Sequence, residues 1–263
     1  MSKSRQHDSA VKIRSFGVTF EGWTAPLPQG IVSPAAGEWH QLIYATRGAL
    51  TLRTEECAWV VPPHRGVWIP SGFKYQVDMT GIVALRILYL HARQRQLPRL
   101  SSCAVVNISP LLRELILRTV RLGALDSDVP EQKRLTGVIL DELRILSAVP
   151  LQLPLPHDPR AARFASLVHQ SSGISLSTAN MLRQCGSSRR TMERLFRAET
   201  AMSLGQWLRR QKLLEALRRI SSGETITAVA IDLGYNSPSA FIAMFRRELG
   251  ETPRRYFETL EPA

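Results

Sequence analysis

Arginine side chains are concentrated in the segment GSSRRTMERLFRAE, which begins at Gly186. Met192, Leu195 and Phe196 stand at helical spacing and predict one buried stripe along this segment. The rest of the helix surface then carries the charged side chains, which are Arg189, Arg190, Glu193, Arg194 and Arg197. A guanidinium group can bind guanine through two hydrogen bonds or hold phosphate, and a carboxylate can accept from cytosine. The pattern indicates a helix that contacts DNA, with a solvated charged surface as the alternative; Glu193 has two open roles, contact with cytosine and orientation of an arginine.

A second segment of the same kind, TAVAIDLGYNSPSAFIAMFRRELG, turns at Gly234. Ser237 is a favourable N-cap, and Pro238 suits the first helical position because its φ angle is preset. The predicted buried row repeats every four residues and comprises Phe241, Phe245 and Leu249. The positions that would face a DNA groove carry small side chains, which are Ser239, Ala240 and Ala243. Arg246 follows later in the helix and is predicted to hold phosphate.

Two helix-turn-helix motifs are the elements that must position these side chains, one over residues 178–199 and one over residues 227–249. Between them, SLGQWLRRQKLLEALRRI predicts one continuous helix from about residue 204 to residue 220, with an apolar side and a basic side that includes Arg218 and Arg219. Recognition helices held apart in this way would enter successive major-groove faces ~34 Å apart. A single chain could then recognise an asymmetric site, and the span favours DNA bending.

The first part of the chain has a different pattern. Residues 1–100 alternate apolar and polar positions in short runs broken by glycine and proline, which predicts the β-strands of a barrel or sandwich. Residues 101–149 change to helical spacing and predict a pair of helices. Prolines at positions 150, 154, 156 and 159 indicate a semi-extended linker over residues 150–159, and residues 160–263 are predicted to be helical. The expected fold class is α+β.

The composition favours a polyanionic partner in a reducing compartment. The net charge is +12 over 263 residues, and residues 160–263 carry 16 Lys and Arg against 9 Asp and Glu. The three cysteines have no disulfide or zinc spacing. The polar start has no signal-peptide pattern, and the most apolar stretch, GIVALRILYL, is too short to span a bilayer. We expect a cytoplasmic protein without a membrane partner.

The last hundred residues resemble the DNA-binding domain of AraC/XylS-type transcriptional regulators. The resemblance is carried by GSSRRTMERLFRAE, RRQKLLEAL, AIDLGYNSPSAFIAMFRRELG and the closing ETPRRYF. It implies base contacts from Arg190, Glu193 and Arg194 in the first motif, and from Pro238, Ser239, Ala240 and Ala243 in the second. Two departures from the family are Leu182, where alanine is common, and Ala243, where arginine is common. The second departure indicates that the first motif carries most of the sequence readout.

The region before residue 150, with VVPPHRGVWIPSG, resembles the cupin-like sensor domain that often precedes this module. Cupins often bind metal through a His-x-His pair and a later histidine, but those positions fall here on Ala35, Gly37 and Tyr75. We therefore expect no metal, no cofactor and no enzymatic activity. We expect a small-molecule effector instead of a metal, in a site lined by Trp39, His40, Trp68 and Tyr75. Packing in the core is the alternative role for both tryptophans.

These observations predict a DNA-binding transcriptional regulator with an N-terminal sensor. A metal-dependent cupin enzyme with a basic tail is the alternative of a different class, and a constitutive regulator is the third. The predicted partners are double-stranded DNA, a small-molecule effector, RNA polymerase if the protein is an activator, and a second copy of the chain through the helical pair. Packing of that pair against the barrel is the alternative to dimerisation, and both roles are compatible.

Overall fold

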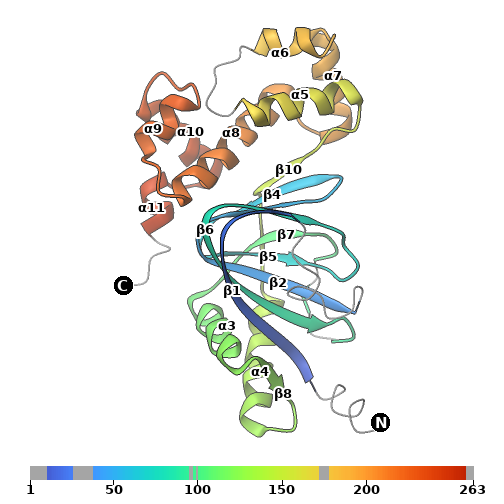
Figure 1. Cartoon of the computed structure of the whole chain (residues 1–263), viewed down its shortest axis with the longest axis vertical. Helices are drawn as coiled ribbons and strands as arrows, with labels where there is room; N and C mark the ends of the chain where they lie inside the picture. The colour runs from blue at the N-terminus through green and yellow to red at the C-terminus, as the bar shows by residue number, and fades with distance from the viewer. Residues whose placement is uncertain (1–10, 26–37, 95–96, 99, 172–177, 259–263) are drawn as a thin grey trace. The chain divides into compact units, whose positions relative to one another are not determined.

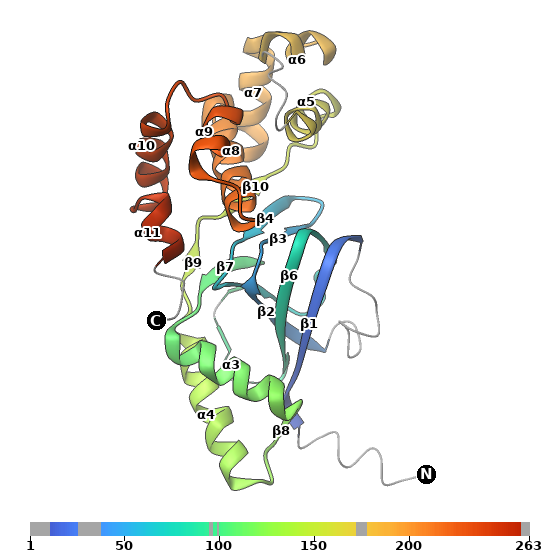
Figure 2. The same cartoon turned by 60° about the vertical axis from the view of Figure 1, so that its left-hand side comes forward.

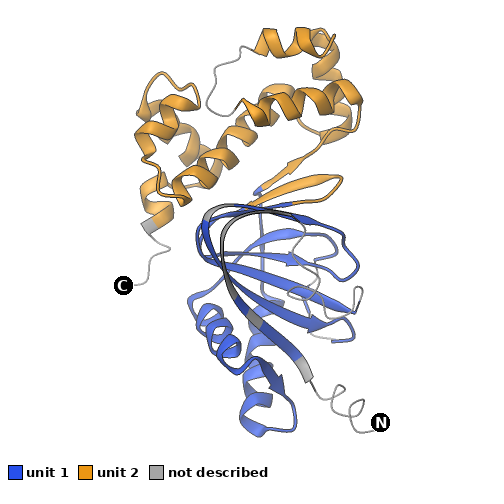
Figure 3. Cartoon of the chain, in the orientation of Figure 1, with its two compact units in different colours: residues 1–52, 61–151 blue, residues 53–60, 152–263 orange. Residues whose placement is uncertain are grey.

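A computed structural model describes residues 11–25, 38–94, 97–98, 100–171 and 178–258. The chain divides into two compact units (Figure 3). Unit 1 comprises residues 1–52 and 61–151, and unit 2 comprises residues 53–60 and 152–263. Residues 53–60, which lie within the region predicted as the sensor, therefore belong to the same unit as the C-terminal helices.

Unit 1 contains an antiparallel sheet in which β6 is the central strand (Figures 1 and 2). The order is β3-β6-β2-β5-β7-β9, and β1 pairs with both β6 and β8. The strands are β1 (Val11–Ala25), β2 (Trp39–Arg47), β3 (Leu50–Arg53), β5 (Arg65–Ile69), β6 (Gln76–His91), β7 (Ala104–Asn107), β8 (Ala124–Asp126) and β9 (Ala148–Val149). The predicted combination of antiparallel strands and a helical region is confirmed, while the cupin-like barrel stays a prediction.

Two helices cover one face of this sheet, α3 (Pro110–Leu122) and α4 (Pro130–Arg144) (Figure 2). Ser109 caps α3 by accepting a hydrogen bond from the amide of Leu112 at 3.0 Å, and its own hydroxyl donates to Glu142 of α4. The core between the helices and the sheet includes Leu42, Trp68, Leu88, Leu112, Ile116, Ile139, Leu140 and Leu143. Burial of each such side chain contributes about 1.5–3 kcal/mol relative to leaving it in water. The helical pair therefore packs against the sheet.

Unit 2 is built from helices and one short strand pair. The helices are α5 (Pro159–Gln170), α6 (Thr178–Gln184), α7 (Arg189–Thr200), α8 (Leu204–Ser221), α9 (Ile226–Asp232), α10 (Pro238–Leu249) and α11 (Pro253–Glu258). Helix α8 begins with a capping box, in which Ser203 and Gln206 satisfy each other's backbone amides. It contacts both α7 and α9 and runs between the two motifs (Figure 1).

Edge-on aromatic contacts join the first motif to α8. The rings of Phe164 and Phe196 lie 5.9 Å apart between centroids, and those of Phe196 and Trp207 lie 5.0 Å apart. All three side chains are buried. Edge-to-face pairs of this kind add to the free energy gained by apolar burial. They link α5, α7 and α8 into one core.

A separate aromatic row stabilises the second motif. Successive ring centroids lie 5.5, 5.9 and 5.6 Å apart along Tyr235, Phe241, Phe245 and Tyr256. This row joins the turn before α10, α10 itself and α11. The predicted row from Phe241 to Leu249 is wrong at its end, because Leu249 is partly exposed and Met244 is buried in its place. The helix faces its neighbours on the side that includes Met244.

Of the segment predicted as a linker, residues 150–159, the part from residue 152 onward belongs to unit 2. It contains β10 (Gln152–Pro154), which pairs with β4 (Cys57–Val61), and α5 already begins at Pro159. The indole nitrogen of Trp207 donates to the carbonyl oxygen of Pro154 at 2.8 Å. Proline lacks an amide donor, which suits a short strand with one neighbour, but its carbonyl still accepts. Sequence alone showed the prolines and missed these partners.

The predicted basic side of α8 is also corrected in its second half. Arg218 binds Glu215 through two hydrogen bonds, and Arg219 binds both Glu224 and Asp232. The guanidinium of Arg219 is buried, and Asp232 lies on α9. Arg219 therefore holds the second motif on α8, because a buried charge requires paired partners, whereas Arg218 pairs within α8 itself.

Replacement of Arg219 should test this role. Arg219→Met keeps an unbranched side chain but leaves Glu224 and Asp232 without their cation, and we expect it to lower the free energy of unfolding by about 1.5–3 kcal/mol. Denaturant titration followed by helical circular dichroism measures the change. Arg134→Met is the matched control, since Arg134 forms an exposed pair with Glu131 and its loss should cost below about 1 kcal/mol. Equal effects of the two substitutions would contradict the role.

Candidate nucleic-acid interface

The first recognition helix follows a tight turn at Gly186. This residue has φ +57°, a left-handed conformation that glycine adopts without strain. Ser188 then accepts a hydrogen bond from the amide of Thr191 at 3.1 Å and caps α7. Leu182, at the position where the family commonly has alanine, is buried in α6. The motif thus accommodates the larger side chain.

Helix α7 presents an arginine-rich surface to solvent. Met192, Leu195 and Phe196 are buried, as their spacing predicts. Arg189, Arg190, Arg194 and Arg197 are exposed. Among the described residues, the first three have neither an ion pair nor a side-chain hydrogen bond, so their guanidinium groups are available to a ligand.

Glu193 has a structural partner that sequence reasoning missed. Its Oε2 atom accepts from the backbone amide of Leu204 at 3.2 Å, and its Oε1 atom lies 3.8 Å from Nη2 of Arg197. Leu204 is the first residue of α8, where amides lack partners within the helix. The carboxylate thus contacts the start of α8 and lies beside Arg197, while the two roles left open by the sequence, contact with cytosine and orientation of an arginine, stay predictions.

The second motif uses the same turn chemistry. Thr225 caps α9 by accepting from the amide of Ala228 at 3.2 Å. Gly234 has φ +78°, and the amide of Tyr235 donates back to the carbonyl of Ala230 at 3.0 Å. Ser237 then accepts from the amide of Ala240 at 3.2 Å, with Pro238 at the first position of α10. These interactions fix the angle at which α10 leaves the turn.

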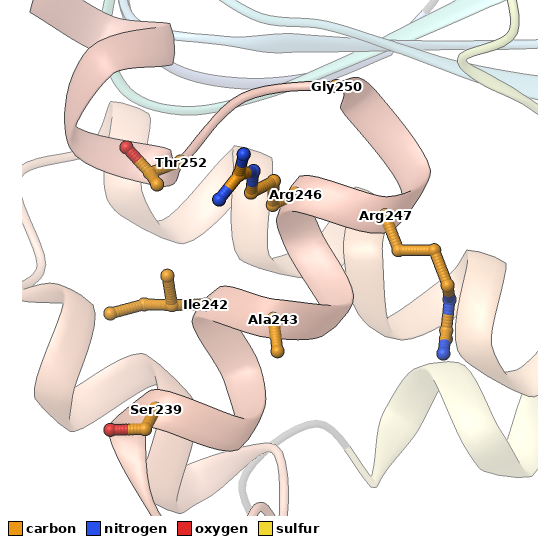
Figure 4. A pocket seen from close by; sticks show the side chains of 7 residues that line it. All are labelled: Ser239, Ile242, Ala243, Arg246, Arg247, Gly250 and Thr252. Carbon is orange, nitrogen blue, oxygen red and sulfur yellow. The ribbon is translucent and has the colours of Figure 1, made fainter.

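The exposed face of α10 is mostly small. A shallow hollow of about 600 Å³ lies along it, lined by Ser239, Ile242, Ala243, Arg246, Arg247, Gly250 and Thr252 (Figure 4). Arg246 points toward Thr252, and Arg247 leaves the helix on the other side (Figure 4). Ser239, Ala240 and Ala243 are exposed and provide a single side-chain hydroxyl among them. Helix α10 can approach a surface closely but has few groups for hydrogen bonds to bases.

The four residues predicted to line an effector site do not form one site. Successive side chains of a strand point to opposite faces, so Trp39 and His40 of β2 point to different faces. The ring of His40 stacks on Trp68 at 5.2 Å, on the face that carries α3 and α4. The hydroxyl of Tyr75 donates to Oε1 of Gln41 at 2.6 Å, and Gln41 shares the face of Trp39. The structure therefore separates these side chains into two pairs.

Burial shifts the pKa values of two of these side chains, His40 and Tyr75. It lowers the pKa of His40, whose Nδ1 atom accepts from the amide of Ser71 at 2.9 Å, so the imidazole is held neutral. It raises the pKa of Tyr75. Within the described part of the chain, no three histidine, cysteine or acidic side chains lie close enough together to hold a metal ion. Ala35 and Gly37, where the sequence places the expected ligand pair, lie outside the described residues.

Sequence reasoning also missed a contact beside the turn of the second motif. The ammonium of Lys212 on α8 lies 5.2 Å from the ring centroid of Tyr235. The available signal was the spacing of Arg209 and Lys212, which places both on one side of the helix.

In the parts of the chain that are described, no helix is long and apolar enough to cross a membrane.

Comparison with known proteins agrees with this arrangement. The sequence model of the helix-turn-helix domain matches residues 181–259. The chain is 34% identical over 220 residues to the HTH-type transcriptional regulator NimR of Escherichia coli (strain K12). The aligned region covers 84% of this chain and 80% of that protein. It is 37% identical over 75 residues to the regulatory protein SoxS of Salmonella typhimurium, which covers 28% of this chain and 70% of that protein.

Among solved structures, the DNA-binding domain of AdpA in complex with a target DNA is 32% identical, covers 39% of this chain and 93% of that chain, and has a TM-score of 0.35. The family is shown by the sequence matches. The helix-turn-helix match spans both α7 and α10, and the NimR match extends through most of both proteins. The chain belongs to the AraC/XylS family of HTH-type transcriptional regulators.

Proposed function

We propose that this regulator binds an asymmetric operator with two recognition helices of unequal weight. Helix α7 enters one major-groove segment and reads bases with Arg190 and Arg194. Helix α10 enters the next segment, ~34 Å along the duplex, and holds mainly the backbone through Arg246. The observation that carries this proposal is the contrast between the two exposed faces, because α7 exposes Arg190 and Arg194 without partners among the described residues and α10 exposes Ser239 and two alanines.

The difference in weight follows from the chemistry of the side chains. A bidentate arginine–guanine contact discriminates against a wrong base by about 1–3 kcal/mol. Alanine at positions 240 and 243 has no hydrogen-bonding group and can only contact a thymine methyl or the sugar. Close approach of α10 still allows Arg246 to neutralise a phosphate, which adds affinity without sequence information.

Unit 1 supplies regulation in this proposal. The sheet face that carries Trp39, Gln41 and Tyr75 binds a small apolar effector with a polar end, as in a cupin-like sensor. Binding shifts the population of the conformations in which unit 2 is free to bind DNA. RNA polymerase is a further partner if the regulator is an activator. The DNA-binding role supports a cytoplasmic location. Effector binding would raise the thermal stability of the full chain.

The helical pair supplies a dimer surface in this proposal. Leu111 and Leu122 lie on one stripe of α3, and Val138 and Ile145 lie on one stripe at α4, by their helical spacing. Each is well exposed, from 37% for Leu122 to 74% for Ile145. Their neighbours Leu112 and Ile139 are buried against the sheet, so the helices can serve both as cover and as interface.

Selection of bound sequences from a random duplex pool tests the operator. The full-length chain at physiological salt should enrich one motif with two blocks about one helical turn apart, and the first block should be the more sharply defined. Equal definition of both blocks would contradict the unequal weights. A failure to enrich any sequence, with binding that vanishes as salt rises, would contradict sequence-specific regulation.

Arg194 is the sharpest single test of base readout. Arg194→Ala should weaken specific binding by about 1–3 kcal/mol and relax the preference at one base position. Arg246→Ala should weaken binding equally on all sequences and reduce the slope of log affinity against log salt by about one. Both are measured by titration of matched and mismatched duplexes. If Arg194→Ala weakens binding equally on all sequences, Arg194 contacts the phosphate backbone of the DNA and not a base.

Glu193 should act through α8 and Arg197 and not through a base. Glu193→Gln keeps an acceptor for the amide of Leu204, so stability and base preference should change little. Glu193→Ala removes the acceptor and should lower the free energy of unfolding by about 1 kcal/mol. If Glu193 instead contacts cytosine, Glu193→Gln will shift the preference toward adenine, which glutamine recognises. Repeating the duplex selection with each variant separates the outcomes.

The proposed dimer surface can be disrupted by charge. The double variant Leu111→Glu and Val138→Glu should convert a dimer into a monomer in sedimentation velocity, because burying unpaired carboxylates is unfavourable. Ile231→Glu is the matched control, since Ile231 is 60% exposed on α9 of unit 2. A dimer that persists in the double variant would contradict the assignment.

A further inference from the structure

The first half of α8 carries two cations that no carboxylate neutralises in the described part of the chain. Arg209 is exposed and Lys212 is partly buried, and their three-residue spacing places them on the same side of the helix. Among the described residues, neither side chain forms an ion pair. Further along the same helix, Arg218 and Arg219 are both bound by carboxylates. Helix α8 therefore has a neutralised half and a charged half.

The charged half lies against the turn that leads into α10. The Nζ atom of Lys212 lies over the ring of Tyr235, and a Cβ atom on Gly234 would lie 3.7 Å from it. A cation–π contact orients the ammonium without cancelling its charge. Burial lowers the pKa of Lys212, and a neighbouring anion would favour its charged form.

A third cation reaches the same turn from α10. Burial raises the pKa of Tyr235, and the charges of Arg247 and, more weakly, Arg209 lower it, opposed by the charge of Glu248. Arg247 also lines the hollow on the exposed face of α10. Its own carboxylate neighbour is Glu248, with an N–O distance of 3.7 Å. Lys212, Arg209 and Arg247 thus all act on Tyr235, the residue after the turn at Gly234.

We propose that Lys212 and Arg209 bind backbone phosphates in the centre of the operator, between the two major-groove segments. The inference rests on the proposed two-block operator. A helix that joins two recognition helices in successive major-groove segments runs past the intervening minor groove, where phosphates of both strands line the edge. The ammonium held on Tyr235 and the exposed guanidinium of Arg209 would release counterions there and add affinity that is independent of sequence.

The test compares Lys212→Gln with wild-type full-length protein on the selected operator and on a random duplex of equal length. Loss of one phosphate contact should reduce the slope of log affinity against log salt by ~0.9 on both duplexes. Lys212→Arg should restore the slope. Lys133→Gln, which removes an exposed lysine from α4 of unit 1, is the matched control and should leave the slope unchanged. Thermal unfolding of each variant checks that the fold is retained.

Neutral methylphosphonates locate the contact on the DNA. Replacing the central phosphates should weaken wild-type binding and should have a smaller effect on Lys212→Gln, since the two changes remove the same contact. An unchanged slope, or an equal methylphosphonate effect in both proteins, would overturn the proposal. Either result, with a two-block operator still selected by the wild type, would leave the proposed function intact. Failure of the wild type to select a sequence would instead count against the proposed function.

Discussion

The packing of both helix-turn-helix motifs on α8 is the constraint on which the rest of unit 2 depends. Trp207 joins the first motif to this helix through Phe196, and Arg219 joins the second through Glu224 and Asp232. Glu193 adds a further link, from α7 to the first amide of α8. Because α8 is one continuous helix from Leu204 to Ser221, the separation of the recognition helices is set by a rigid element. The spacing of any operator blocks must match it.

The arginines of unit 2 serve two different purposes, and their environment distinguishes them. Arg219 is buried with two carboxylates, so its charge contributes to the fold and is withdrawn from ligands. Arg190 and Arg194 are exposed without partners among the described residues, so their charge is available to DNA. The net charge of +12 counts both kinds of arginine together, so it does not distinguish paired arginines from exposed ones. Among the described residues of unit 2, the cations without an ion pair include Arg190 and Arg194 on α7, Arg246 on α10, and Arg209 and Lys212 on α8.

The two faces of the sheet in unit 1 carry different side chains. The face with Leu42 and Trp68 is filled by α3 and α4. The opposite face carries Trp39 and the hydrogen-bonded pair of Gln41 and Tyr75. Alternation along β2 is what divides them, because adjacent residues such as Trp39 and His40 must point apart. An effector would therefore contact only one of the two pairs that the sequence had grouped.

The sequence by itself determined the elements and their chemistry, because these depend on neighbours within one or two turns. Gly186 and Gly234, the caps Ser188 and Ser237, and the stripe of Met192, Leu195 and Phe196 are local signals, and the mixed fold class follows from the change of period after residue 100.

Only the tertiary structure decided which charges are paired and which apolar side chains are covered. Arg219 meets Asp232 through the packing of α9 on α8, Glu193 meets Leu204 across a turn, and β10 finds β4 about a hundred residues earlier in the chain. Such partners are distant in sequence, and the free energy of a charge or a strand depends on what finally lies beside it. Composition and spacing contain no record of that outcome.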